Sequence, residues 1–367
     1  MSGRWGLPDI GGSWPDGRRL EVGGRVREGR FGMEKLGAAS FQWMAERAQG
    51  ERRAYIYHGG VPLPERQLIA RIRKLSGKKS LIGDDCAVLE PPSGHELLVT
   101  TDLCLEGVHF RRDWHPAESV GHRCLARGLS DIAAMAGEPL ACFLSLGLPV
   151  DIPQKWVDRF LAGFTDLARR FDVPLAGGDT GESKSGIVAD VILVGSAPKG
   201  KAVRRSGAKP GDLIYVTGEL GGSAATLQRL LREKVKASKA SRHFYPQPRI
   251  AVARKLRGIA TSMIDLSDGL STDLAHICEE SGVGAELEAT RIPVTTGATL
   301  RDALHGGEDY ELLFTASEKK PVAAAATRVS VRRIGRVTHD RRQMMWLKTP
   351  DGKRMPMPVG GWEHFRK

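Results

Sequence analysis

The chain has 367 residues, of which 41% are hydrophobic and 27% are charged, and its formal net charge is +12. This length predicts two globular domains, and the longest apolar stretch, residues 140–150, is far shorter than the roughly 20 residues of a membrane span. That stretch is too short to predict a membrane protein. The basic residues come as short pairs spread along the chain, so a nucleic-acid-binding protein is not predicted either.

The first 60 residues are rich in glycine and arginine and show no sustained periodicity, apart from a possible short helix at residues 33–47. We therefore expect residues 1–60 to form a disordered extension. The first residues, Met1-Ser-Gly-Arg-Trp-Gly, lack an apolar core behind a basic start, so no secretory or lipidation signal is expected and a cytoplasmic protein is predicted. The chain has no Cys-x-x-Cys pair, so its cysteines are expected to be buried small hydrophobes, not disulfides or zinc ligands: Cys86, Cys104, Cys124, Cys142 and Cys278.

The predicted order begins with a helix from Pro64, ending before Gly77, in which apolar residues recur at helical spacing. A strand follows at residues 97–101, then helices at 117–136 and 153–171 and a strand at 187–195. These elements make up a predicted N-terminal α/β domain, residues 61–200.

The second half, residues 201–367, opens with a strand at residues 213–217, a glycine-rich turn and a helix from Ser223. Further patterns predict a strand ending at Ile264, a helix at 270–281, and strands at 311–315 and 331–337. Both halves therefore mix helices and strands, and we expect an α/β fold with mixed sheets.

Aspartates in five short motifs carry the chemical signal of the sequence. The motifs are Gly83-Asp84-Asp85, Thr100-Thr101-Asp102, Ser130-Asp131, Gly177-Gly178-Asp179-Thr180 and Asp265-Leu266-Ser267-Asp268-Gly269. All but Ser130-Asp131 are predicted at strand ends or turns. Mg²⁺ takes oxygen ligands, and glycine lets a phosphate approach the backbone closely. The pattern predicts several Mg²⁺ ions held against a polyphosphate.

Each motif taken alone also has a structural explanation. Asp84 and Asp85 could form a turn, Asp179 could cap a helix or turn, and Asp268 could cap the helix that begins at Leu270. Asp131 is harder to explain in that way, because it lies in a helix with apolar neighbours, where an unpaired carboxylate is costly. A bound cation would offset that cost.

Any nucleotide is expected to bind without a P-loop, because no Gly-x-x-x-x-Gly-Lys-Ser/Thr motif occurs. The turn Gly218-Glu-Leu-Gly221-Gly222 lacks the spacing of a dinucleotide-binding loop. Its glycines are interpreted as serving close strand-to-helix packing.

Together these motifs resemble the thiamine-monophosphate kinase family, over about residues 63–365. Further segments carry the likeness: Glu106-Gly107-Val108-His109-Phe110, Ser206-Gly207-Ala208-Lys209-Pro210-Gly211-Asp212 and Gly306-Gly307-Glu308-Asp309-Tyr310-Glu311-Leu312. The resemblance implies a two-domain fold like that of aminoimidazole ribonucleotide synthetase, with the N-terminal sheet forming the interface of a homodimer. It also implies that ATP and thiamine monophosphate meet between the domains to give thiamine diphosphate.

The resemblance carries roles onto particular residues of this chain. The implied Mg²⁺ ligands are Asp85, Thr100, Thr101, Asp102, Asp131, Asp179, Asp265 and Asp268. The implied ATP contacts are Phe171, Gly178, Asp179, Arg205 and Ser267. The implied contacts to thiamine monophosphate are His109, Glu308 and Trp362. Without the family, these last three read as a core-edge histidine, a loop carboxylate and a hydrophobic plug.

Two departures from the family pattern concern the nucleotide. Phe171 stands where the family usually has tyrosine, which removes a hydroxyl, and Gly181-Glu182 stand where it tends to have threonine and arginine. No general base is predicted, because the acceptor phosphate is already ionised near neutral pH.

Other readings stay open at this point. Selenophosphate synthetase, hydrogenase-maturation protein and the purine synthetase share the implied fold, but the first needs a reactive N-terminal cysteine or selenocysteine and the second a C-terminal cysteine, and this chain ends Trp362-Glu-His-Phe-Arg-Lys367. A non-catalytic, cation-binding interaction module is the alternative from a different class.

Overall fold

A computed structural model describes residues 62–78, 81–82, 86–87, 89–233, 235–326, 329–340 and 345–363. All of them belong to one structural unit, Tyr57–Lys367. The predictions for residues 1–60, including the helix at 33–47, lie outside the described residues, and so do Asp84 and Asp85.

The first half of this unit is a four-stranded sheet with the strand order β1-β4-β2-β3. Its strands are β1 (His95–Leu105), β2 (Glu138–Leu148), β3 (Leu175–Glu182) and β4 (Val188–Pro198). Its helices are α2 (Glu65–Ser76), α3 (Ala117–Ala134) and α4 (Gln154–Arg170). Strand β1 is longer than predicted, because β4 pairs with it along its whole length. Asp102 therefore lies within a strand and not after one.

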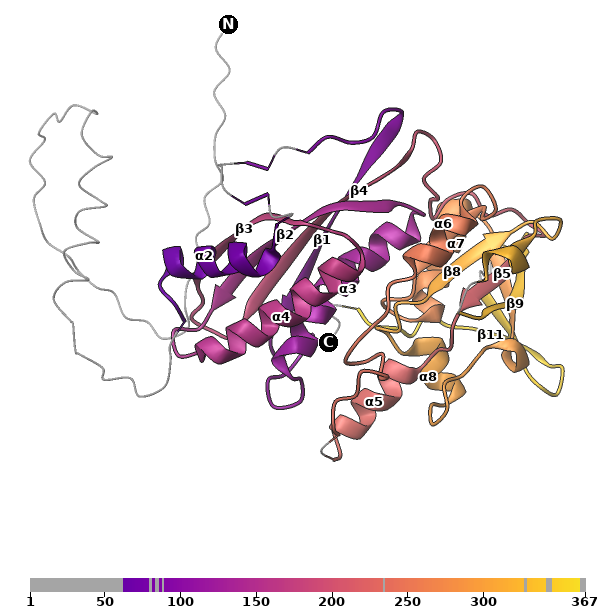
Figure 1. The fold of residues 1–367 in the computed structure, drawn as a ribbon. Helices are drawn as coiled ribbons and strands as arrows, with labels where there is room; N and C mark the ends of the chain where they lie inside the picture. The colour runs from indigo at the N-terminus through magenta and orange to yellow at the C-terminus, as the bar shows by residue number, and fades with distance from the viewer. Residues whose placement is uncertain are drawn as a thin grey trace, which may run out of the picture. The chain divides into compact units, whose positions relative to one another are not determined.

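Helices α3 and α4 lie side by side on one face of this sheet (Figure 1). Each is the crossover between two parallel strands, α3 from β1 to β2 and α4 from β2 to β3, and right-handed crossovers in the same direction place both helices on one face. The two helices approach closely through glycines, since a Cβ at Gly121 or Gly163 would lie 1.9 Å from a backbone oxygen of the other helix.

The second half is a seven-stranded sheet with the order β11-β10-β7-β9-β5-β8-β6. Its strands are β5 (Leu213–Thr217), β6 (Ser262–Asp265), β7 (Gly284–Glu288), β8 (Leu312–Ala316), β9 (Val331–Thr338), β10 (Met345–Lys348) and β11 (Arg354–Pro356). Its α-helices are α5 (Gly222–Leu230), α6 (Ile250–Leu256), α7 (Leu270–Ser281) and α8 (Leu300–His305).

The two halves share apolar packing. The hydrophobic core of the first sheet continues through α3 to α6, β6 and β8 of the second half, while a separate core fills the space around α7. Because α3 packs on β1, β6 and α6, its side chains reach both halves. This contact makes α3 the element on which the functional site is built.

Most predicted elements are present, with different ends. The helix predicted at residues 117–136 ends at Ala134, because Ala136 adopts a left-handed conformation with φ of 54° and Gly137 donates a hydrogen bond back to Ile132. The sequence analysis did not predict β2, β3, β7, β10 or β11 as strands. Strand β3 contains three glycines, and β10 and β11 have four and three residues, so their patterns are weak.

The glycine-rich turn after β5 lies close to other parts of the chain. Gly218 and Gly221 have φ of 61° and 84°, and a Cβ at Gly218 would lie 2.2 Å from the carboxylate of Glu311. One cysteine prediction is wrong: four cysteines are buried, but Cys86 is exposed on the surface, in a segment outside the helices and strands. Among the described residues, no helix is both long and apolar enough to cross a membrane.

Candidate functional site

A cavity of about 530 Å³ is lined by both halves of the unit. The first half contributes residues of β1, the turn after it, and α3; the second half contributes α5, the loop after β6, the loop between α8 and β8, and the C-terminal segment. This volume is in the usual range for small-molecule sites. Eight of the predicted site residues line it: Asp102, His109, Asp131, Asp265, Ser267, Asp268, Glu308 and Trp362.

One end of the cavity carries carboxylates. Ser130 Oγ donates to Asp265 Oδ2 at 2.7 Å, and Thr100 Oγ1 donates to Asp131 Oδ2, so neighbouring residues of α3 contact β6 and β1. Asp102 Oδ1 accepts a hydrogen bond from Arg127 Nη2 at 3.0 Å. Thr100, Asp102, Asp131 and Asp265 are therefore brought together in this part of the cavity.

These carboxylates raise one another's pKa. Burial, with the charges of Asp265 and Asp102, raises the pKa of Asp131 to about 8. Burial is also the main cause that raises the pKa of Asp265 to about 6 and that raises the pKa of Asp102. The fully ionised cluster is thus unfavourable in the protein alone.

The donor set is chemically suited to a hard cation, because its oxygens are those that Mg²⁺ prefers and a cation would offset the repulsion between them. Among the residues that the structure describes, however, no three Asp, Glu, His or Cys side chains form a complete ligand group. Asp85, which the resemblance adds to the set, is outside the described residues.

The other end of the cavity is formed by His109, Glu308 and Trp362. His109 follows β1 in a tight turn, and its Nδ1 accepts a hydrogen bond from the Leu105 N–H at 3.0 Å, which leaves the proton of a neutral ring on Nε2. Glu308 has a left-handed backbone with φ of 64°, and its N–H donates to the Ser267 carbonyl at 2.8 Å. The Trp362 N–H donates to the Asp268 carbonyl at 3.0 Å. Backbone hydrogen bonds therefore tie Glu308 and Trp362 to the aspartate loop.

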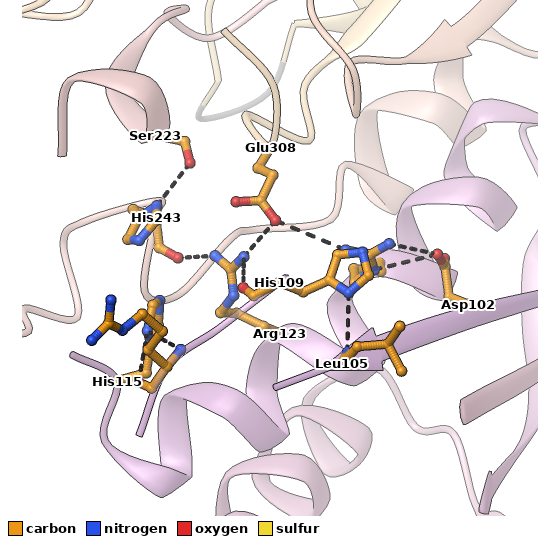
Figure 2. A network of polar contacts seen from close by, with 10 residues as sticks. Asp102, Leu105, His109, His115, Arg123, Ser223, His243 and Glu308 are labelled. Atoms are coloured by element: carbon orange, nitrogen blue, oxygen red, sulfur yellow. Dashed lines mark hydrogen bonds and ion pairs between the residues drawn. The ribbon is translucent and has the colours of Figure 1, made fainter. Parts of the chain in front are cut away.

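Arg123 of α3 connects the pieces of this end (Figure 2). Its guanidinium donates to Glu308 Oε1 at 2.6 Å, to the His109 carbonyl at 3.2 Å, and to the His243 carbonyl. Burial raises the pKa of Glu308, but the charge and hydrogen bond of Arg123, together with the charges of His243 and Arg127, outweigh it and lower the pKa to about 2. Glu308 is therefore an ionised acceptor at neutral pH.

Asp179 and Thr101 lie away from this cluster. The register Asp102↔Val191↔Leu144↔Gly178 puts β3 three strands from β1, about 14 Å at the usual strand spacing. Asp179 and Thr101 alternate with Gly178 and Asp102, so they point to the sheet face opposite α3. Within one copy, Asp179 does not join the carboxylates of β1 and α3.

Gly178 and Asp179 instead line a second cavity of about 580 Å³, together with Ile69 and Ile72 of α2 and Phe143 of β2. Arg205 is exposed and close enough to Asp265 to lower its pKa. Phe171 ends α4 and packs against the hydrophobic core, and it lines neither cavity. The implied ATP contacts are thus spread over several places.

The sequence analysis missed Arg123 and Arg127. Both belong to a stripe with Asp131 at spacings of four residues, and residues four apart lie on the same side of a helix. The four-residue spacing places both arginines on the same helix face as Asp131 and could have identified them as site residues. The sequence analysis interprets the basic residues as surface charge instead. It also missed Tyr310 and Ser223, which line the cavity.

Comparisons with known proteins extend over both halves. Residues 83–197 match the family "AIR synthase related protein, N-terminal domain", and residues 209–348 match its C-terminal domain. The thiamine-monophosphate kinase of Escherichia coli is 38% identical over 303 residues, covering 77% of this chain and 91% of that protein. The Bacillus subtilis enzyme is 33% identical, covering 78% and 93%.

Solved structures give the same picture. A thiamine-monophosphate kinase from Stenotrophomonas maltophilia matches with a TM-score of 0.70 and 32% identity, covering 81% of this chain and 99% of that chain. AaThiL in complex with AMPPCP and TMP matches with a TM-score of 0.67 and 33% identity, covering 82% and 97%. Hydrogenase maturation protein HypE, at 18% identity, shares the fold.

Proposed function

The chain belongs to the thiamine-monophosphate kinase family, and from this we propose that it transfers the γ-phosphoryl group of ATP to thiamine monophosphate, giving thiamine diphosphate. The observation that carries the proposal is the cavity with two unlike ends. One end offers carboxylates, and the other offers His109, Glu308 and Trp362. A relative solved with AMPPCP and TMP together supports the pair of substrates.

The substrate-binding end suits the thiamine part of the acceptor. Glu308 presents an ionised carboxylate that can accept a hydrogen bond from an aminopyrimidine, and Trp362 presents an aromatic face to which a cationic thiazolium is attracted. His109 is proposed to bind the acceptor and not to accept a proton. The acceptor phosphate is ionised near neutral pH, so transfer requires no general base.

Asp102, Asp131 and Asp265 are the residues proposed to hold Mg²⁺, with Thr100 and Asp268 beside them. The ions would supply charge neutralisation between two anionic substrates, which is the main obstacle to phosphoryl transfer. The raised pKa of Asp131 supports this assignment, because a buried carboxylate repelled by its neighbours favours a bound cation. Asp85, Thr101 and Asp179 remain proposed ligands.

Nucleotide binding is proposed to involve Ser267 and Arg205 near Asp265, with Gly178, Asp179 and Phe171 as the further contacts that the family implies. Transfer is proposed to be direct and in line, with both substrates bound at once. A cytoplasmic location is part of the same proposal, since ATP is the phosphoryl donor.

We also propose that the enzyme works as a homodimer through its N-terminal sheet. The face of that sheet opposite α3 exposes apolar residues of β1: Leu97 is 51% exposed, Val99 is 64% exposed and Leu103 is 50% exposed. An apolar face of this kind marks an interaction site. The division into residues 61–200 and 201–367 remains the proposed domain boundary.

The direct test is incubation of the purified protein with ATP, Mg²⁺ and thiamine monophosphate, with thiamine diphosphate separated and quantified. The proposal expects product in proportion to ADP, and loss of most product in Asp102→Asn. Binding of Mg²⁺ without any thiamine diphosphate would instead indicate a non-catalytic cation-binding module.

A further inference from the structure

Arg127 lines the substrate cavity and lies between Asp102 of the carboxylate end and Glu308 of the other end. It lies on α3 one turn before Asp131 and one turn after Arg123, and its side chain is 15% exposed. Among the described residues that line this cavity, it is the one lysine or arginine. The carboxylate cluster lies on one side of it and the thiamine-binding end on the other.

The contacts of Arg127 span the same two ends. Its Nη2 donates to Asp102 Oδ1 at 3.0 Å, and its Nη1 is 3.8 Å from Glu308 Oε1. Arg127 and Glu308 therefore form an ion pair, but the 3.8 Å between Nη1 and Oε1 is too long for a hydrogen bond. Within the described part of the chain, Nη1 therefore donates no hydrogen bond and faces the cavity with donor capacity to spare.

Arg123 has a different environment, although it is the next basic residue on the same stripe. Its side chain is 1% exposed, and its terminal nitrogens donate to Glu308 and to the carbonyls of His109 and His243. It does not line the cavity. Arg123 can therefore hold the thiamine-binding end in place without Arg127.

We propose that Arg127 binds the phosphate group of the acceptor, as a contact in addition to the metal ions; this inference rests on the proposed function. An acceptor that places its thiamine rings against Glu308 and Trp362 must carry its phosphate past Arg127 to reach the carboxylates. A planar guanidinium with available donors suits a phosphate, which accepts two parallel hydrogen bonds.

A cation bound at Asp102 would make the Arg127 guanidinium more available for binding phosphate. A cation bound to Asp102 Oδ1 would compete with Arg127 for the same oxygen and repel its positive charge. With such a cation bound, the guanidinium would lose Asp102 as its partner inside a low-dielectric cavity, and the phosphate of the acceptor would offer it a new one. Arg127 would thus exchange its contact with the Asp102 carboxylate for a contact with the acceptor phosphate.

The test compares two ligands that differ only in the phosphate: thiamine monophosphate and thiamine. Their dissociation constants are measured calorimetrically, with Mg²⁺ present, for the wild type, Arg127→Gln, Arg127→Lys and the control Arg159→Gln. Arg159 is half exposed, pairs with Glu118 and does not line the cavity. Thermal unfolding of each variant checks the fold, and product formation by the wild type checks the proposed function separately.

In Arg127→Gln, the affinity for thiamine monophosphate should fall about tenfold or more, while that for thiamine changes less than about twofold. Arg127→Lys should be intermediate, because lysine keeps the charge but not the paired donors. Equal losses for both ligands, or an unchanged preference for the phosphorylated one, would overturn the inference, since Arg127 would then only brace Asp102 and Glu308. A wild type that binds both ligands yet makes no thiamine diphosphate would count against the proposed function instead.

Discussion

Arg123 and Glu308 form an ion pair, with 2.6 Å between Nη2 and Oε1, that joins α3 of the first half to the loop before β8 in the second (Figure 2). The arginine is 1% exposed, and the carboxylate is 25% exposed because it faces the cavity. The same arginine also donates to the His109 carbonyl. One buried cation therefore fixes the relative positions of two proposed substrate-binding residues.

Glu308→Gln should weaken both stability and substrate binding. The buried guanidinium of Arg123 loses its charge partner, and leaving such a charge uncompensated costs about 3 kcal/mol in free energy of unfolding. The KM for thiamine monophosphate should rise more than that for ATP. Urea unfolding and steady-state kinetics measure the two effects.

The matched control is Glu286→Gln, whose carboxylate pairs with the half-exposed Arg354 on the surface. An exposed ion pair contributes little, so this variant should lose less than about 1 kcal/mol. If Glu308→Gln were no less stable than Glu286→Gln, the buried ion pair would not stabilise the contact between the two halves.

Asp131→Asn should make the metal-free protein more stable while removing most of the activity. The folded-state pKa of Asp131 is raised to about 8, so above the unfolded-state value the ionised group destabilises the fold, and stability falls as pH rises toward 8. Asparagine removes that charge but can still accept the hydrogen bond from Thr100. In EDTA at pH 8, the variant should gain about 1 kcal/mol or more.

Addition of Mg²⁺ should make the wild type more stable than Asp131→Asn, because the wild type gains a ligand that the variant binds weakly. Melting curves with and without Mg²⁺ provide the comparison. Near-native turnover of Asp131→Asn at saturating Mg²⁺ would remove Asp131 from the proposed metal ligands.

Three buried histidines should make the protein sensitive to mild acid. Burial lowers the pKa of His115 and His122 to about 4 and that of His243 to about 3, with nearby arginine charges adding to the shift. The unfolded chain then binds more protons than the folded one below about pH 6.5, so stability falls as pH drops from 6.5 toward 4. Each histidine contributes a slope of up to about 1.4 kcal/mol per pH unit.

His122→Gln should flatten this dependence, whereas the same change at the half-exposed His276 should leave it unaltered. Urea unfolding at a series of pH values gives the slopes. A wild-type stability that stays level between pH 6.5 and pH 5 would show that these rings are not held neutral.

Trp362→Ala should raise the KM for thiamine monophosphate by about 2- to 10-fold and change that for ATP much less. The indole is 56% exposed and lines the cavity, so its contribution should come from the ligand and not from packing. Trp362→Phe keeps an aromatic face and should be intermediate. Parallel changes for both substrates would identify the tryptophan as a plug of the C-terminal segment.

The parts of the site that could be predicted are those carried by local motifs. Asp102, Asp131 and Asp265 stand beside hydroxyl residues within a few positions of the chain, and the structure does bring them together. The long helices were predictable for the same reason, since the apolar spacing in α3 and α4 repeats over several turns.

What could not be predicted depends on contacts between distant segments. No pattern near Arg123 in the chain predicts its ion pair with Glu308, which is 185 residues away. Glu308 has a left-handed backbone, and its N–H donates a hydrogen bond to the Ser267 carbonyl. The separation of Asp179 from Asp102 follows from strand order, which local patterns do not determine. Short strands such as β10 and β11 form only because a neighbouring strand pairs with them.

The measurement that tests the central claim most directly is the configuration of the transferred phosphoryl group. ATP that is chiral at the γ-phosphorus, made with oxygen isotopes, is turned over with thiamine monophosphate and Mg²⁺, and the thiamine diphosphate is analysed. Direct in-line transfer between two substrates bound in one cavity predicts inversion, with kinetics of a ternary complex. Retention with ping-pong kinetics would require a phosphorylated enzyme, and it would contradict the account.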